Sequence, residues 1–175
     1  MNFNLLLVRH AKSSWSNPSL TDFDRPLNKR GASNAPLMGQ RIRNYGLLLD
    51  TIITSTAERA KETSKLIAKE IKYELQDIDL ESDLYHASRQ VFINILSKQR
   101  NRNIAMVGHN PGIQDFSYWL CSEPTINFPT CGVIHISFSL DNWKEIYKRT
   151  KSFSFFSKMQ LESILCPQRK GPTLD

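Results

Sequence analysis

The sequence predicts an α/β domain of three layers, in which helices cover both faces of a mostly parallel central sheet. Short unbroken apolar runs, such as residues 5–8 and 104–107, are typical of strands that are buried on both faces. Segments with helical periodicity alternate with these runs, as in sheets whose parallel strands are joined by helices. At 175 residues with 40% hydrophobic content, the chain is long enough for one domain with a substantial core.

The N-terminal half is expected to contain two strands and two helices. The first helix should end before Gly46, because glycine is a frequent residue at helix C-termini. The expected elements are, in order, a strand over residues 5–8, a loop rich in Ser, Asn, Pro and Asp over 13–30, a helix over 31–45, a strand over 51–54 and a helix over 57–71.

The C-terminal half continues this alternation after an acidic segment, residues 74–86, for which no regular element is predicted. Residues 132–140 alternate cleanly, which places Ile134, Ile136 and Phe138 on one face of a strand. The other expected elements are a helix over 91–98, a strand over 104–107, a helix over 111–121 and a last strand around Phe153 and Phe155. We therefore expect one domain over residues 1–166, followed by a loose tail over 167–175.

Composition and charge argue against several classes of protein. The net charge of +6 arises from basic residues that are mixed with 17 acidic ones, and no nucleic-acid-binding signature accompanies them. A mildly cationic surface suits an anionic substrate equally well, so nucleic acid is not an expected partner. No apolar run reaches the length of a membrane span or of a signal peptide core. The three cysteines form no Cys-x-x-Cys pair, and we expect free thiols in a cytoplasmic monomer.

Basic residues stand at the ends of three predicted strands. Arg9 and His10 end the first strand, Arg59 follows the second, and His109 follows the strand over 104–107. Because the carboxyl ends of parallel strands meet at one edge of a sheet, these four side chains should surround one pocket. Without an excess of acids in the same motifs they would repel one another unless an anion lay between them. The pattern therefore predicts a phosphate site.

Two of these strand ends also carry signals for the start of a helix. Ser55 and Glu58 have the spacing of a capping box, which puts Arg59 in the first turn, where free backbone N–H groups favour an anion. Asn110 is expected to cap the later helix, with Pro111 in its first turn. Both signals place the basic residues on strand-to-helix turns.

Signals for other kinds of phosphate chemistry are weaker. Asp22-Phe23-Asp24 is similar to the paired aspartates of metal-dependent aspartyl phosphatases, but no apolar strand precedes it, and we interpret it as a loop feature. None of the three cysteines has an arginine six residues later, as cysteine phosphatases require, and glycine-rich phosphate loops are absent from the sequence. Since no carboxylate cluster suggests a metal ion, we expect neither a metal nor a cofactor.

In combination, these segments resemble the histidine phosphatase superfamily, which has the phosphoglycerate mutase-like fold. The opening Arg-His-Ala-Lys-Ser-Ser-Trp and the short spacing from Arg59 to His109 are most similar to the SixA-like phosphohistidine phosphatases. The segments that carry the resemblance are Arg9-His10-Ala11 for the opening motif, 24–31 for the following loop, 55–63 for the second arginine and Gly108-His109-Asn110 for the second histidine.

This resemblance implies a metal-independent phosphatase with a phosphohistidine enzyme intermediate. His10 would be the nucleophile, while Arg9 and Arg59 would bind the phosphoryl oxygens through their planar donor groups. His109, if protonated, would add a further donor to the charge that develops on those oxygens. Candidate residues for the rim of the site are Lys12, Ser16, Arg25 and His86.

The general acid is the least defined part of the expected site. Ser82 stands where the family's mutases carry a glutamate, and the flanking Glu81 and Asp83 could serve, although a solvated acidic loop fits equally well. Phosphohistidine expels imidazole, whose conjugate acid has a pKa of about 6.5, and it needs less proton assistance than an alkoxide. We therefore expect phosphohistidine in proteins as the substrate. The alternatives are small phosphoesters or sugar phosphates and, outside the enzymes, a non-catalytic phosphate-binding module.

Overall fold

A computed structural model describes residues 2–121, 128–150 and 159–165 of the chain. In these residues six strands form one sheet, in the order β3-β2-β4-β1-β5-β6. The strands are β1 (Asn2–Arg9), β2 (Thr51–Ser55), β3 (Ile78–Glu81), β4 (Asn103–Gly108), β5 (Val133–Ser139) and β6 (Met159–Leu165). β1 to β4 are parallel, whereas β5 runs antiparallel to β1 and β6 antiparallel to β5. The predicted, mostly parallel α/β fold is confirmed.

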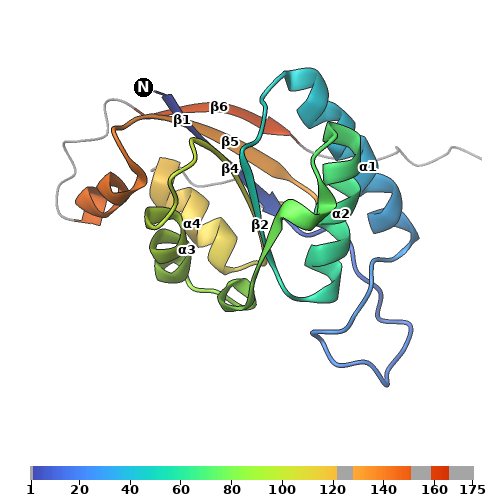
Figure 1. Ribbon diagram of the computed structural model, residues 1–175. Helices are drawn as coiled ribbons and strands as arrows, with labels where there is room; N and C mark the ends of the chain where they lie inside the picture. The colour runs from blue at the N-terminus through green and yellow to red at the C-terminus, as the bar shows by residue number, and fades with distance from the viewer. Residues whose placement is uncertain (1, 122–127, 151–158, 166–175) are drawn as a thin grey trace, which may run out of the picture.

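Helices cover both faces of this sheet (Figure 1). On one face lie α1 (Lys29–Tyr45) and α2 (Glu58–Ile71). On the other lie α3 (Arg89–Ser97) and α4 (Gly112–Cys121), together with the 3-10 segment η3 (Trp143–Thr150). The molecule therefore has the three layers that the alternating pattern predicts.

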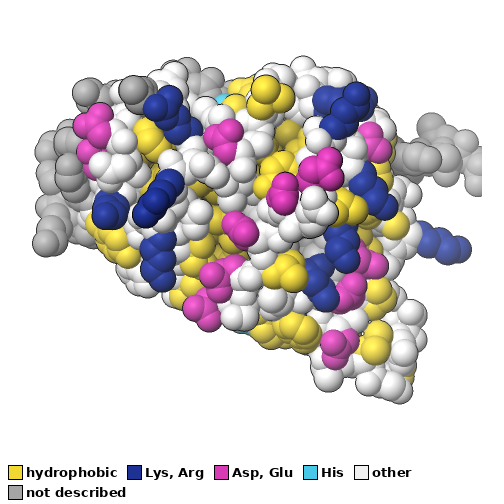
Figure 2. Space-filling model, in the orientation of Figure 1, with side chains coloured by type: hydrophobic (Ala, Val, Ile, Leu, Met, Phe, Trp, Pro, Cys, Tyr) yellow, Lys and Arg dark blue, Asp and Glu magenta, His cyan; other side chains and the backbone are white. Residues whose placement is uncertain are grey.

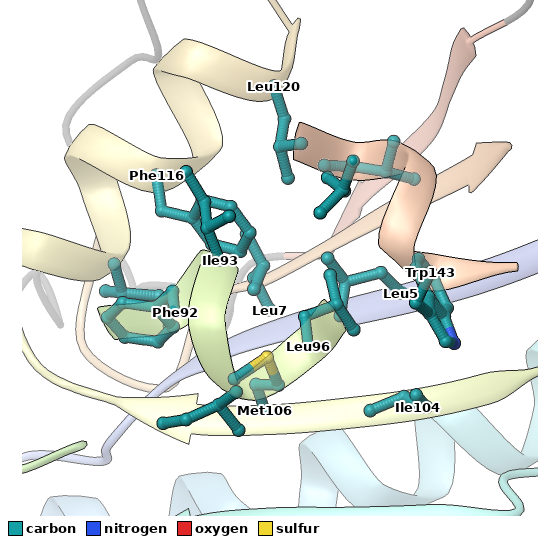
Figure 3. Packing of buried hydrophobic residues seen from close by; sticks show 14 of the residues in the cluster. Leu5, Leu7, Phe92, Ile93, Leu96, Ile104, Met106, Phe116, Leu120 and Trp143 are labelled. Carbon is teal, nitrogen blue, oxygen red and sulfur yellow. The ribbon is translucent and has the colours of Figure 1, made fainter. Parts of the chain in front are cut away.

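Each face of the sheet has its own hydrophobic core, and β1 contributes to both. Leu5 and Leu7 pack in the cluster that contains α3 and α4, while Leu6 and Val8 pack in the cluster beneath α1 and α2. Figure 3 shows the first of these cores, where Phe92 of α3 lies near Phe116 of α4, with the two rings stacked at a centroid distance of 5.4 Å. Burial on both faces explains why the apolar run in β1 is unbroken.

The structure confirms the first predicted helix and extends it by two residues. The Asn28 side chain accepts a hydrogen bond from the Gly31 N–H at 2.9 Å, which starts α1 at Lys29. Gly46 ends the helix with a left-handed φ of 84°, a conformation that glycine adopts without strain. The helix starts two residues earlier than its apolar periodicity predicts because Asn28, which lies before the periodic segment, caps it.

The acidic segment 74–86, for which the pattern predicts no element, contains an edge strand. β3 lies between two short 3-10 turns, η1 (Leu75–Asp77) and η2 (Ser82–Leu84), and pairs in parallel with β2. All four residues of β3 are at least partly exposed, since the strand has a neighbour on one side only. Such a strand lacks the apolar run that marks a buried one, and this explains why the sequence does not reveal it.

The alternation predicted near the C-terminal end is also found. In β5, Ile134, Ile136 and Phe138 are buried in the α3 and α4 core. The strand expected around Phe153 and Phe155 falls outside the described residues, as does the tail over 167–175, so the domain boundary remains a prediction. β6 follows at Met159–Leu165.

Surface charge is mixed on the face that Figure 2 displays, where Lys and Arg side chains are interspersed with Asp and Glu. In the part of the chain that the structure describes, no helix is long and apolar enough to cross a membrane. The mixed charge agrees with the composition, in which basic residues only moderately outnumber acidic ones.

Candidate functional site

The register of the sheet brings the basic strand ends together. Arg9 of β1 is paired with Gly108 of β4, and the His10 N–H donates to the Gly108 carbonyl at 3.0 Å. The rings of His10 and His109 consequently lie side by side, with centroids 4.9 Å apart. Arg59, from the first turn of α2, places its Nε 3.4 Å from Nε2 of His10. The predicted convergence of these residues at the carboxyl edge of the sheet is therefore present.

His10 is buried and has a defined tautomer. Its Nδ1 lies 2.8 Å from the carbonyl oxygen of Ala11, which can only accept, so Nδ1 carries the hydrogen and Nε2 keeps its lone pair. Burial lowers the pKa of His10 to about 4; the hydrogen bond to Ala11 opposes this shift, whereas the charges of Arg59 and Arg9 reinforce it. At neutral pH, His10 is thus an uncharged imidazole with Nε2 available as a nucleophile.

His109 is bound to the end of β2. Its Nε2 lies 2.8 Å from Oγ of Ser55, and its Nδ1 is buried with no partner in the described residues. Burial, followed by the charges of His10 and Arg59, lowers the pKa of His109 to about 2. Burial therefore favours a neutral His109 imidazole over the protonated donor that the resemblance implies. When the Ser55 hydroxyl donates to Nε2, Nδ1 carries a hydrogen that is free to donate.

The helix caps expected at these turns differ from the prediction. The N-cap of α2 is Ala57, and Ser55 accepts a hydrogen bond from the Ala57 N–H at 3.3 Å instead of closing a capping box with Glu58. Asn110 donates through Nδ2 to Gln114 at 2.8 Å, while its Oδ1 is buried and has no partner among the described atoms. Both predicted caps are wrong because their side chains make other contacts next to His109.

The two arginines are held in different ways. Arg59, only 3% exposed, donates from Nη1 to the backbone oxygen of Asp22 and from Nη2 to its carboxylate at 3.0 Å. Arg9 donates from Nη1 to the carbonyl of Phe128 at 2.6 Å, and its buried Nε has no partner in the part of the chain that is described. The site thus retains unsatisfied donors on Arg9 and His109, which is what an oxyanion requires.

Sequence reasoning missed Asp22, which the structure places among the basic residues. Its Oδ2 accepts from Arg59 at 3.0 Å and from the Tyr85 hydroxyl at 2.9 Å, and its Oδ1 lies 2.8 Å from Nη2 of Arg25. Partial burial raises the pKa of Asp22, but the hydrogen bond from Tyr85 and the charges of Arg59 and Arg25 lower it to about 2. Asp22 is therefore an anion at neutral pH.

This carboxylate corrects the expectation that the site holds cations without an acid. It partly balances Arg59 and Arg25 in the absence of a ligand, so the charges alone do not demand a phosphate. Asp22-Phe23-Asp24 lies in a turn, and Asp22 serves as an ion-pair partner of the arginines, a role for which the sequence analysis gives no expectation. The spacing of three residues between Asp22 and Arg25, which form an ion pair, is the signal that could have identified it.

The candidate rim residues occupy different positions. Arg25 is only 7% exposed, its guanidinium carbon lies 3.4 Å from the centroid of the Trp15 ring, and its Nη1 has no partner among the described residues. Lys12 and Ser16 are exposed, and Oγ of Ser16 lies 2.8 Å from that of Ser14. Arg25 is thus more closely integrated with the site than Lys12 or Ser16.

Near the end of β3, the structure brings Tyr85 and His86 to the site. The His86 ring stacks on that of His109 with centroids 6.2 Å apart, and Tyr85 meets the same ring edge-on at 5.6 Å. Glu81 accepts from the Asp83 N–H at 3.1 Å, and the Asp83 side chain is exposed. In the described part of the chain, neither acid forms a hydrogen bond or ion pair with the four basic residues.

The described residues contain no cluster of three or more His, Cys, Asp or Glu side chains arranged to bind a metal ion. Burial raises the pKa of the Cys131 thiol to about 12, so this thiol stays protonated. Cys166 lies outside the described residues.

Comparison with known proteins gives consistent results. Residues 5–84 match the model of the histidine phosphatase superfamily (branch 1). An uncharacterized chloroplastic protein of Arabidopsis thaliana is 29% identical over 173 residues, which cover 93% of this chain and 77% of that protein. A SixA structure from Agrobacterium tumefaciens superposes with a TM-score of 0.75 at 24% identity, covering 95% of this chain and 99% of that one.

A second solved structure, of the protein histidine phosphatase SixA complexed with tungstate, has a TM-score of 0.74 at 15% identity and covers 94% of this chain and 97% of that one. At these identities, the two solved structures show that the fold is shared. Several curated relatives are longer: against the mitochondrial serine/threonine-protein phosphatases PGAM5, the aligned part spans only 23–25% of their length.

Proposed function

We propose that this protein hydrolyses phosphohistidine in proteins through a phosphohistidine enzyme intermediate. The proposal is supported by the match of residues 5–84 to the histidine phosphatase superfamily and by the fold shared with SixA structures. One observation carries the proposal: Nε2 of the neutral His10 keeps its lone pair, which accepts a long hydrogen bond from Nε of Arg59 at 3.4 Å, beside the ring of His109. A nucleophile surrounded by donors suited to oxyanions is the arrangement that phosphoryl transfer requires.

The proposed reaction proceeds in two displacements at phosphorus. In the first, Nε2 of His10 forms a bond to phosphorus while the bond to the leaving group breaks. Arg59 and Arg9 bind the phosphoryl oxygens, with Arg59 exchanging part of its contact to Asp22 for the substrate. In the second, water attacks phosphorus and the bond to His10 breaks, which releases inorganic phosphate and restores the neutral imidazole.

The substrate class rests on the leaving group. Ser82 occupies the position of the family's glutamate, so a strong carboxylic acid is not expected there, and phosphohistidine is the substrate with the better leaving group. The fold shared with a protein histidine phosphatase supports the same assignment. Small phosphoesters or sugar phosphates are the alternative substrates, and a non-catalytic phosphate-binding module is the alternative outside catalysis.

We further propose that no metal ion or cofactor takes part, because Arg9 and Arg59 supply the positive charge that a metal ion would otherwise contribute. The initial rate should then be unchanged in a chelator such as EDTA, and a loss that added metal restores would refute the proposal. A cytoplasmic monomer acting on a phosphorylated partner also remains a proposal, which cell fractionation and light scattering would test.

The decisive experiment compares kcat/KM for a phosphohistidine protein with that for a panel of small phosphoesters. We expect a preference for phosphohistidine and, for His10→Ala, complete loss of turnover with an unchanged circular dichroism spectrum. A preference for alkyl or sugar phosphates would overturn the substrate assignment. Inorganic phosphate binding by the wild-type protein without turnover of any substrate would instead favour the phosphate-binding module.

A further inference from the structure

The end of β3 offers a group that could deliver a proton where the family's glutamate is replaced. Ser82 follows β3 directly; of the two flanking acids, Glu81 accepts from the Asp83 N–H and the Asp83 side chain is exposed. Three and four residues after Ser82, Tyr85 and His86 lie against the ring of His109. His86 is the ionisable group of this segment that both touches the site and is open to solvent, with 59% of its side chain exposed.

The backbone holds His86 in a defined and unusual conformation. Its φ of 52° lies in the left-handed region, which residues other than glycine adopt rarely and which is found repeatedly at functional sites. Leu84 and Ala87 on either side of Tyr85 and His86 are buried, which anchors the segment. A Cβ on Gly112 would collide with the Ala87 carbonyl, so α4 approaches this segment as closely as glycine allows.

The surroundings of His86 suit a proton carrier. Its Nε2 lies 3.5 Å from Oδ2 of Asp22, its ring packs against Tyr85 at 4.2 Å, and it stacks on His109 with an interplanar angle of 18°. Asp22 also forms ion pairs with Arg25 at 2.8 Å and Arg59 at 3.0 Å, and the Arg59 guanidinium carbon lies 5.9 Å from the centroid of the Tyr85 ring. Histidine is the side chain best suited to exchanging protons near neutral pH.

The other ionisable groups at the site are unsuited to this task. Burial keeps His10 and His109 neutral, and Asp22 is ionised. Tyr85 donates its hydroxyl hydrogen to Asp22, and burial together with that contact raises its pKa. His86 is left as the one described neighbour of His109 that is exposed to water and can be reprotonated between turnovers.

We propose that His86 is the catalytic proton donor to the leaving group, and that Asp22 is the residue that positions it. This inference rests on the proposed phosphatase function. As Nε2 of His10 bonds to phosphorus, the bond to the leaving atom breaks and the His86 imidazolium transfers its proton to that atom. In the second displacement, neutral His86 takes a proton from the attacking water, so that it ends the cycle protonated again.

The test uses leaving groups that differ in their need for a proton. His86→Asn keeps a residue that tolerates the left-handed backbone and can bond to Asp22, but it cannot act as an acid. We expect its kcat/KM to fall about a hundredfold for an alkyl phosphate, and to change little for 4-nitrophenyl phosphate, whose leaving group needs no proton. With the alkyl phosphate, the fall in wild-type rate at alkaline pH should be absent from the variant.

Lys72→Asn is a matched control, because Lys72 is also exposed with a left-handed φ of 59° but lies at the C-terminus of α2. It should leave the rate unchanged for both phosphates. An equal loss for both substrates in His86→Asn, or no loss for either, would overturn the role of His86. Failure of the wild-type protein to turn over any phosphate would overturn the proposed function itself, which keeps the two outcomes distinct.

Discussion

Asp22 joins Arg59 and Arg25 through opposite oxygens of one carboxylate, and thereby connects the loop after β1 to α2. This arrangement has two opposed effects on an incoming oxyanion. It orients the guanidinium of Arg59 beside His10, and it also offers Arg59 a competing negative charge. Removing the negative charge of Asp22 should therefore strengthen phosphate binding while it slows turnover.

We expect Asp22→Asn to bind inorganic phosphate several-fold more tightly while its kcat falls about tenfold, which corresponds to about 1.4 kcal/mol in the barrier. Asn retains an acceptor oxygen but not the charge that fixes both arginines. The measurement is the inhibition constant for phosphate beside kcat with one substrate. Asp24→Asn is the control, because this exposed neighbour bonds only to Thr21 among the described contacts. Weaker phosphate binding in Asp22→Asn would contradict the competing role.

The individual site residues differ in how far the sequence reveals them. His10 and His109 follow buried apolar strands, and the parallel sheet brings any such strand ends together, so their proximity could be predicted. Asp22 lies in a long loop, and its position depends on contacts with Arg59 and Tyr85 that are 37 and 63 residues away. The spacing of Asp22 and Arg25 is a local signal for their ion pair, but no local pattern encodes the contacts with Arg59 and Tyr85. The same reasoning explains why Ser55 is found bonded to His109 and not in a capping box.

At the scale of elements, the approach of α4 to the segment after η2 determines where His86 lies. Gly112 is buried at the start of α4, and the Ala87 carbonyl occupies the space that a side chain would need. This contact joins an irregular segment to the core beneath α3 and α4. A single methyl group is enough to disturb it, because both partners are backbone.

We expect Gly112→Ala to lower the free energy of unfolding by about 1–3 kcal/mol through this overlap, and to reduce turnover as the His86 segment moves. Urea unfolding together with kcat measures both effects. Tyr118→Ala is the control on the same helix. Half of the Tyr118 side chain is exposed, so this substitution should lower the free energy of unfolding much less. If Gly112→Ala is as stable and active as the wild type, the segment with His86 and Ala87 can move without loss of stability or turnover, which would contradict this prediction.

Elements with buried apolar faces could be predicted from the sequence, within two or three residues at their ends. β3 could not, because among the described strands it pairs with β2 only and its four residues, Ile-Asp-Leu-Glu, are all at least partly exposed, so they form no buried apolar run. α1 began earlier than its apolar pattern because Asn28, a polar residue outside that pattern, caps it. The missed features are thus those stabilised by backbone or polar contacts and not by burial.

For the molecule as a whole, two buried neutral histidines connect stability to pH. The pKa of His10 is about 4 in the folded protein and that of His109 about 2, whereas the ordinary value is 6.5. Below pH 6.5 the unfolded chain therefore binds protons that the folded protein does not. The free energy of unfolding falls as the pH drops, and for His10 the fall levels off near pH 4.

Between pH 7.5 and 5, His10 alone should lower the free energy of unfolding by about 2 kcal/mol at most. His10→Gln cannot take up a proton, so its stability should decline less over this range. Urea unfolding of both proteins at the two pH values makes the comparison. Identical declines would show that His10 is protonated as easily in the folded protein as in the unfolded chain.

Trp15 lies on the outside of the molecule with 72% of its side chain exposed, directly over the guanidinium of Arg25. That guanidinium forms an ion pair with Asp22, and Asp22 forms one with Arg59, so the indole is three contacts from Arg59. An oxyanion that draws Arg59 away from Asp22 changes the charge facing the indole, and with it the emission of this tryptophan. The protein thus carries its own fluorescent reporter of occupancy, which Trp15→Phe would silence while leaving Trp119 and Trp143 as background.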